Sequence, residues 1–111
     1  MQANCIFCKI IAGIIPSTII DQNEHVIVIK DIAPQTPIHY LIIPKVHVEN
    51  IKHVSQNHDH MLSALLLMAQ KLGTQLPEPQ EYRLKINNGF SVGQRVFHLH
   101  MHFLAGTEFP D

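Results

Sequence analysis

Three histidines alternate with apolar residues near the end of the chain, in the segment VFHLHMHFLAG at residues 96–106. On a β-strand, residues two apart share a face, so His98, His100 and His102 point to one side. The intervening apolar residues, Phe97 included, then point into the core. The outer histidines start roughly 13 Å apart, and a Zn–N bond is only about 2.0–2.1 Å long, so all three do not easily reach one metal ion. We therefore expect the three imidazoles to have at least two different functions.

The composition is typical of one globular domain over residues 1–111, with 46% hydrophobic and 15% charged residues. A net charge of −1 gives no basic surface for nucleic acid. The longest apolar run, LSALLLMA, is too short to span a membrane, and the first residues lack the pattern of a signal peptide. We expect a reduced, cytoplasmic protein without nucleic acid or membrane partners.

Local patterns predict an α+β fold. Helical periodicity and caps predict a short helix over 5–13 and a long one over 58–75, with Asn57 as its N-cap. Alternating or β-branched runs predict strands over 25–31, 38–45, 81–89 and 96–106. Four strands that hairpins can join, beside one long helix, favour an antiparallel sheet with the helices on one face.

The segment HLHMHFL resembles the signature of the histidine triad family, in which three histidines alternate with apolar residues. The segments CIFCKI, 30–47 and 85–102 resemble the corresponding parts of its nucleoside phosphoramidase branch, also called histidine triad nucleotide-binding proteins. The resemblance implies a five-stranded antiparallel sheet with one long helix and a short N-terminal helix. It also implies a homodimer, paired through the long helix and the strand near 82–86 into one ten-stranded sheet.

The same resemblance implies a hydrolase that binds purine nucleoside monophosphates or their conjugates and needs no organic cofactor. Such an enzyme cleaves nucleoside phosphoramidates or related conjugates at the α-phosphate through a nucleotidyl-histidine intermediate. By this resemblance His100 is the nucleophile. Its chemistry suits that role, because a neutral imidazole can attack phosphorus when its other nitrogen donates a hydrogen bond. His102 matches a proton donor or hydrogen-bond partner of the leaving group, and His39 joins the same network.

By the same resemblance, Asp31 binds the ribose hydroxyls, since a carboxylate accepts two hydrogen bonds from a diol. Asn87, Gly93 and Gln94 match positions around the α-phosphate, where N–H groups stabilise phosphoryl charge. The slot for the base is implied to be apolar and formed by Ile6, Phe7, Ile10, Ile29 and Ile32.

Two features depart from the family pattern. Arg95 stands where many eukaryotic members have a serine that contacts phosphate, so it either grips the phosphate or turns outward. The final residues GTEFPD replace a family tail that ends in Trp-Pro-Pro-Gly and shapes the leaving-group side of the partner's site. Leaving-group preference is therefore open.

Cys5 and Cys8 form one C-x2-C pair, which supplies half of a tetrahedral zinc site. Family members with this pair bind zinc with two further histidines, which match His47 and His98 here. The resemblance thus implies a structural Zn²⁺, and the alternative is two reduced cysteines in a helix.

Two other functions remain open at this point. One is the family branch that hydrolyses dinucleoside polyphosphates. The other is a nucleotide-binding regulatory protein with vestigial catalysis.

Overall fold

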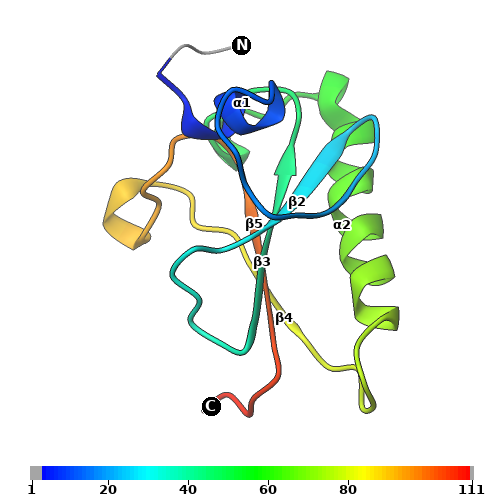
Figure 1. Cartoon of the computed structure of the whole chain (residues 1–111). Coiled ribbons are helices and arrows are strands. Elements are labelled where there is room, and N and C mark those ends of the chain that lie inside the picture. Colours follow the sequence, from blue (N-terminus) through cyan, green and yellow to red (C-terminus); the bar gives the residue numbers. More distant parts are fainter. Residues whose placement is uncertain (1–3, 111) are drawn as a thin grey trace.

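A computed structural model describes residues 4–110 (Figure 1). Two α-helices and five strands follow one another along the chain, joined in places by single 3₁₀ turns. They are α1 (Ile6–Ile11), β1 (Ile19–Gln22), β2 (Val26–Lys30), β3 (Ile38–Pro44), α2 (Asp59–Thr74), β4 (Arg83–Lys85) and β5 (Met101–Ala105). None of the helices in this part of the chain is long and apolar enough to cross a membrane.

The five strands form one antiparallel sheet in the order β1-β2-β3-β5-β4. This confirms the α+β fold and the strand number that the family resemblance implies. The central pair, β3 and β5, brings Leu41 opposite His102 and His39 opposite Leu104. The register therefore places His39 of one strand beside the last triad histidine of the next.

The two helices cover opposite faces of the sheet, so the prediction of both helices on one face was wrong. Alternation along β2 gives the reason. Val26 and Val28 pack in the cluster that contains α2, whereas Ile27 and Ile29 pack in the cluster that contains α1. Both faces of β2 are apolar, so each needs a cover. In Figure 1, α2 (green) lies along one side and α1 (blue) near the top.

The triad histidines lie on the α1 side of the sheet, and Leu99, Met101 and Phe103 lie on the α2 side. The alternation predicted for this segment is therefore correct for those three core residues. Phe97 is the exception, because 46% of its surface is exposed. The histidines do not face open solvent, since Phe7 of α1 packs edge-on against His98 and His100.

Several element boundaries differ from the sequence-based prediction. β1 was not predicted, β4 is shorter than 81–89, and β5 begins only at Met101. Leu99 leaves the ladder because its N–H donates to the main-chain oxygen of Val48 at 2.7 Å. The long helix begins after a 3₁₀ turn over Gln56–His58 rather than at an Asn57 cap.

Candidate active site

A cavity of about 540 Å³ lies between α1, the end of β2, the loop after it, and the triad segment. Its lining includes His100 and His102 together with all but one of the ten residues predicted to bind substrate. These are Ile6, Phe7, Ile10, Ile29, Asp31, Ile32, Asn87, Gly93 and Arg95. The fold thus brings the predicted apolar slot, the carboxylate and the histidines to one hollow.

The geometry of His100 fixes which ring nitrogen is free. Its Nδ1 lies 2.7 Å from the carbonyl oxygen of His98, and a carbonyl only accepts, so Nδ1–H is the donor. Burial lowers the pKa of His100, so the ring is neutral at pH 7. A neutral imidazole with its proton on Nδ1 has a lone pair on Nε2, which is the form of a nucleophile.

His39, His102 and Asp31 form a second group at the cavity. Nε2 of His39 lies 2.9 Å from Nδ1 of His102 and 3.4 Å from Oδ2 of Asp31. The other ring nitrogen of His39 accepts the main-chain N–H of Gln35 at 3.0 Å. Burial lowers the pKa of His39, and it lowers the pKa of His102 to about 4, so both rings are neutral at pH 7.

The loop predicted to surround the phosphate approaches the cavity through Gly93 and Asn87. Gly93 has φ of +109°, which strains any residue with a side chain. A Cβ at this position would also lie 3.3 Å from Nδ2 of Asn87. Glycine therefore lets the loop pass close beside the Asn87 amide.

Gln94 is the one predicted substrate-binding residue that lies outside the cavity lining; the predicted catalytic residue His39 does not line the cavity either and contacts it through His102. Its side chain is fully buried and donates to the main-chain oxygens of Glu49 and Val96 at 2.7 and 3.1 Å. Its Oε1 accepts from Gly89 N–H at 2.9 Å and from the amide of Asn50 at 3.2 Å. Gln94 thus ties the 89–93 loop to the chain after β3, a role that the sequence did not indicate.

Replacing Gln94 with leucine is expected to lower the free energy of unfolding by at least about 2 kcal/mol. Each buried polar group left without a partner costs about 1–3 kcal/mol, and this substitution leaves several such groups without one. Chemical denaturation is the measurement. Gln56→Leu is the matched control, because Gln56 is exposed on the 3₁₀ turn before α2 and its loss should shift stability by less than about 0.5 kcal/mol. Equal stability of the two variants would contradict the role of Gln94.

Arg95 turns toward its own loop. Nη1 donates to the main-chain oxygen of Phe90 at 2.7 Å, and the guanidinium stacks 4.1 Å from the centre of the Phe90 ring. Of the two alternatives left open, these contacts favour an arginine that turns away from the phosphate toward its own loop, although part of Arg95 still lines the cavity.

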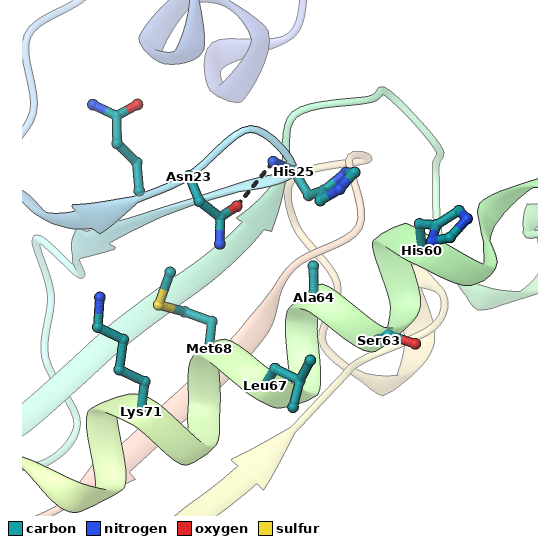
Figure 2. A pocket seen from close by; sticks show the side chains of 9 residues that line it. Asn23, His25, His60, Ser63, Ala64, Leu67, Met68 and Lys71 are labelled. Atoms are coloured by element: carbon teal, nitrogen blue, oxygen red, sulfur yellow. Dashed lines mark hydrogen bonds between the residues drawn. The ribbon is translucent and has the colours of Figure 1, made fainter.

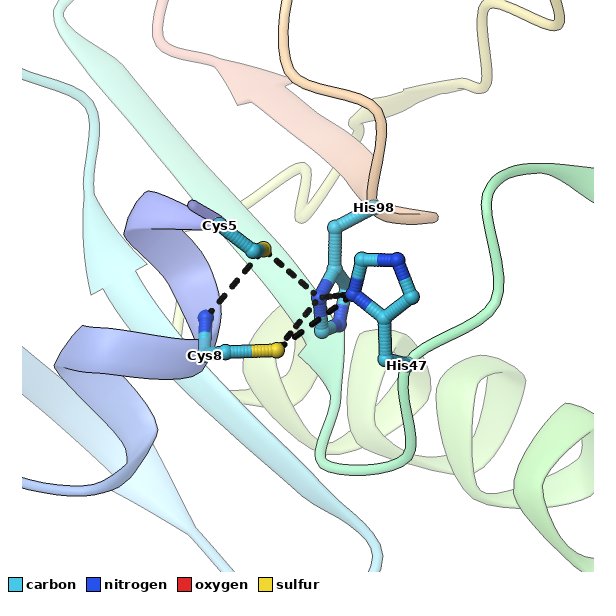
Figure 3. Close-up of side chains that lie close together, drawn as sticks. All are labelled: Cys5, Cys8, His47 and His98. Carbon is cyan, nitrogen blue, oxygen red and sulfur yellow. Dashed lines mark hydrogen bonds between the residues drawn. The ribbon is translucent and has the colours of Figure 1, made fainter. Parts of the chain in front are cut away.

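Cys5, Cys8, His47 and His98 come together beside this cavity (Figure 3). The two cysteines are free thiols on and before α1. Sγ of Cys5 and of Cys8 lie 3.3 and 3.6 Å from Nδ1 of His98, and Cys8 Sγ lies 3.3 Å from Nδ1 of His47. The two Nδ1 atoms are 3.1 Å apart.

These spacings fit a tetrahedral zinc ion. Bonds of about 2.3 Å to sulfur and 2.0 Å to nitrogen place S and N about 3.5 Å apart, and two N atoms about 3.3 Å apart. Nε2–H of His98 donates to the carbonyl oxygen of Pro44 at 2.8 Å, which leaves Nδ1 free for a metal. The four residues therefore form a possible metal-binding group. Because the fourth position is filled, such an ion would be structural.

A second hollow, of about 410 Å³, lies between α2 and the turn after β1 (Figure 2). His25 and His60 stack there with ring centres 6.4 Å apart. The ammonium of Lys71 is paired with Asp21 at 2.8 Å, and this contact lowers the pKa of Asp21. None of the triad histidines lines this hollow, so the first cavity, which His100 and His102 line, is the candidate active site.

Comparison with known proteins agrees with this geometry. A family model described as "Scavenger mRNA decapping enzyme C-term binding" matches residues 4–109. A purine nucleoside phosphoramidase of Escherichia coli K12 is 39% identical over 107 residues, covering 96% of this chain and 90% of that protein. A HIT family hydrolase from Clostridium thermocellum has a TM-score of 0.95 at 43% identity, covering 100% of this chain and 97% of its own. A histidine triad protein from Clostridium difficile has a TM-score of 0.93 at 32% identity, with the same coverage of 100% and 97%. The chain belongs to the histidine triad family.

Proposed function

We propose that the protein hydrolyses purine nucleoside phosphoramidates or related nucleotidyl conjugates at the α-phosphate, through a nucleotidyl intermediate on His100. The observation that carries this proposal is the 2.7 Å hydrogen bond from His100 Nδ1–H to the His98 carbonyl. This bond leaves Nε2 unprotonated, with a free lone pair, on a residue that lines the cavity. The Escherichia coli relative named purine nucleoside phosphoramidase supports the choice of substrate class.

Substrate binding follows from the lining of the cavity. The apolar slot at Ile6, Phe7 and Ile10 takes the flat base, since stacking and apolar contact do not require hydrogen bonds. The carboxylate of Asp31 accepts hydrogen bonds from the ribose hydroxyls. Gly93 and the amide of Asn87 then lie on the side where the phosphate reaches the triad.

The reaction runs in two halves. His100 Nε2 attacks phosphorus, a P–Nε2 bond forms, and the bond from phosphorus to the leaving nitrogen breaks. A water molecule supplies the proton that the leaving amine keeps, while Nδ1–H of the now cationic ring stays on the His98 carbonyl. The hydroxide of that water then attacks phosphorus and the P–Nε2 bond breaks. The products are the amine, the nucleoside monophosphate and neutral His100.

A structural Zn²⁺ on Cys5, Cys8, His47 and His98 completes the proposal. When bound, the ion ties α1 to the end of β3 and to the triad segment. His98 is both a proposed ligand and the acceptor that orients His100, so metal binding also steadies the nucleophile. A reduced, cytoplasmic setting, which keeps both thiols available, stays a prediction.

We also expect a symmetric homodimer. β4 lies at an edge of the sheet, where Tyr82 and Leu84 are exposed, and Leu66 and Leu67 are exposed on α2. An exposed apolar edge is a liability unless something pairs with it. Sedimentation at micromolar concentration should give twice the chain mass, and Leu84→Lys should shift the protein toward monomer. A monomeric wild-type protein would contradict the dimer.

A turnover panel tests the proposed function. The panel compares adenosine and guanosine phosphoramidates with dinucleoside polyphosphates, and release of the monophosphate is measured. We expect higher kcat/KM for the phosphoramidates. A preference for dinucleoside polyphosphates would assign the protein to that branch instead, and tight nucleotide binding without turnover would favour a regulatory protein.

A further inference from the structure

The family resemblance already implies that His102 meets the leaving group. We propose that the main-chain N–H of Gln35, acting through His39, fixes His102 in its neutral form with the proton on Nε2, so that His102 offers a hydrogen bond there rather than a proton. His102 touches the substrate in this scheme, whereas His39 and Gln35 are positioning residues. The inference rests on the proposed function for its catalytic meaning. The proton positions themselves follow from the hydrogen bonds alone.

The first step concerns His39 and the loop before it. The N–H of Gln35 points at Nδ1 of His39 at 3.0 Å. A backbone N–H only donates, so Nδ1 must be the acceptor and carry no proton. His39 is buried, with 3% of its surface exposed, and a neutral imidazole carries one proton. That proton is therefore on Nε2.

The second step is that the proton position on His39 determines the proton position on His102. Nε2 of His39 lies 2.9 Å from Nδ1 of His102, a separation that holds one hydrogen. Because the hydrogen belongs to His39, Nδ1 of His102 is the acceptor. The proton of neutral His102 is then on Nε2, the ring nitrogen that His39 does not engage, and His102 lines the substrate cavity.

The same geometry disfavours a cationic His102. An imidazolium carries a proton on each nitrogen, which would put two hydrogens into the 2.9 Å gap between the two rings. Asp31 does not relieve this conflict, because its Oδ2 faces His39 Nε2 at 3.4 Å and its Oδ1 accepts the N–H of Ala33 at 2.8 Å. His102 thus offers a hydrogen bond to the leaving atom, and water supplies the proton that the amine keeps.

A metal ion is the competing explanation for this group. Ligand atoms of Asp31, His39 and His102 lie within 4.8 Å of one another. A metal on Nε2 of His39 would require the proton to move to Nδ1, where it would meet the N–H of Gln35. His98 is arranged in the opposite way, since its Nε2–H donates to a carbonyl and its Nδ1 is left free. The hydrogen bonds therefore favour a relay at His39 and a metal at His98.

Nitrogen NMR of histidine-labelled protein tests the proton positions without any substrate. Protonated and unprotonated nitrogens of a neutral imidazole resonate far apart, so the tautomer is read directly. We expect His39 and His102 to be neutral at pH 7, each with its proton on Nε2. A proton on Nδ1 of His102, or on both of its nitrogens, would overturn the inference.

Replacing the amide of residue 35 by an ester removes the N–H and keeps the side chain. In this ester variant we expect a second His102 tautomer with its proton on Nδ1. Gln35→Ala is the matched control, since it keeps the N–H and loses the side chain, and we expect wild-type tautomers in it. Wild-type tautomers in the ester variant would show that Gln35 does not fix His102.

Two substitutions of His102 test its chemical role. Glutamine keeps an N–H donor at similar reach but has no proton to give, whereas alanine removes both. We expect His102→Gln to lose roughly tenfold in kcat on a phosphoramidate and His102→Ala roughly a hundredfold or more. Equal losses would overturn the donor role. Absence of turnover in wild-type protein that shows the expected tautomers would instead refute the proposed function and leave the proton assignment standing.

Discussion

Replacing His100 with alanine is expected to lower kcat on a nucleoside phosphoramidate by roughly a thousandfold or more. The substitution removes the only protein atom in the proposed mechanism that forms a bond to phosphorus, so no nucleotidyl intermediate forms. Rapid-quench mass spectrometry of the intact wild-type protein should show an added nucleoside monophosphate, and the variant should show none. Substrate binding should change much less, because the apolar slot and Asp31 are untouched.

An exposed histidine provides the control for this experiment. His53→Ala removes an exposed imidazole that is paired with Glu49 on the surface, and kcat should stay at the wild-type value. His100 is 8% exposed, so its loss leaves a small void, and thermal melting shows whether the variant stays folded. Turnover near the wild-type rate in folded His100→Ala would place the nucleophile elsewhere.

The triad segment shows why much of this site could be predicted. Residues two apart on an extended chain share a face whatever surrounds them, so the division between histidines and core residues follows from spacing alone. Leu99, Met101 and Phe103 are buried as expected. The cavity residues were found differently, through the resemblance to a known family, and periodicity would not have selected Asp31 or Asn87.

Other features depend on partners that are far away in the sequence. Gln94 looks like an ordinary loop residue, and its burial becomes clear only when Glu49 and Asn50 are brought beside it. The role of Gln35 could not be predicted from the type of its side chain, because the group that contacts His39 is its backbone N–H. A signal was present only in its position, within a proline-bearing loop between Asp31 and His39.

The prediction of the strands and their boundaries was incomplete for a similar reason. β1 is an edge strand with half-exposed residues and an irregular register against β2, so its residues carry no strong alternation. The placement of the short helix also needed tertiary information. The length of α1 and its Cys5 cap are local properties, but the face that it covers depends on the apolar residues Ile27 and Ile29 of β2.

Replacing Cys5 and Cys8 together with serine is expected to remove one equivalent of zinc per chain and to lower the melting temperature by more than about 10 °C. A ligand that binds only the folded state stabilises it by about 4.1 kcal/mol when its free concentration is a thousand times Kd. In a domain of this size each kcal/mol shifts the melting temperature by several degrees. Elemental analysis of protein purified without a histidine tag or chelator measures the metal directly.

Treatment with a chelator separates loss of metal from loss of the thiols. The wild-type melting temperature should fall toward that of the double variant, and the double variant itself should not respond. The kcat of the folded protein should change little although its melting temperature falls, because His98 keeps its hydrogen bond to Pro44 and its carbonyl remains beside His100. Zinc far below one equivalent in the wild-type protein would make Cys5 and Cys8 buried thiols. The 3.1 Å approach of His47 to His98 would then have to be a direct hydrogen bond, with the proton on Nδ1 of His47.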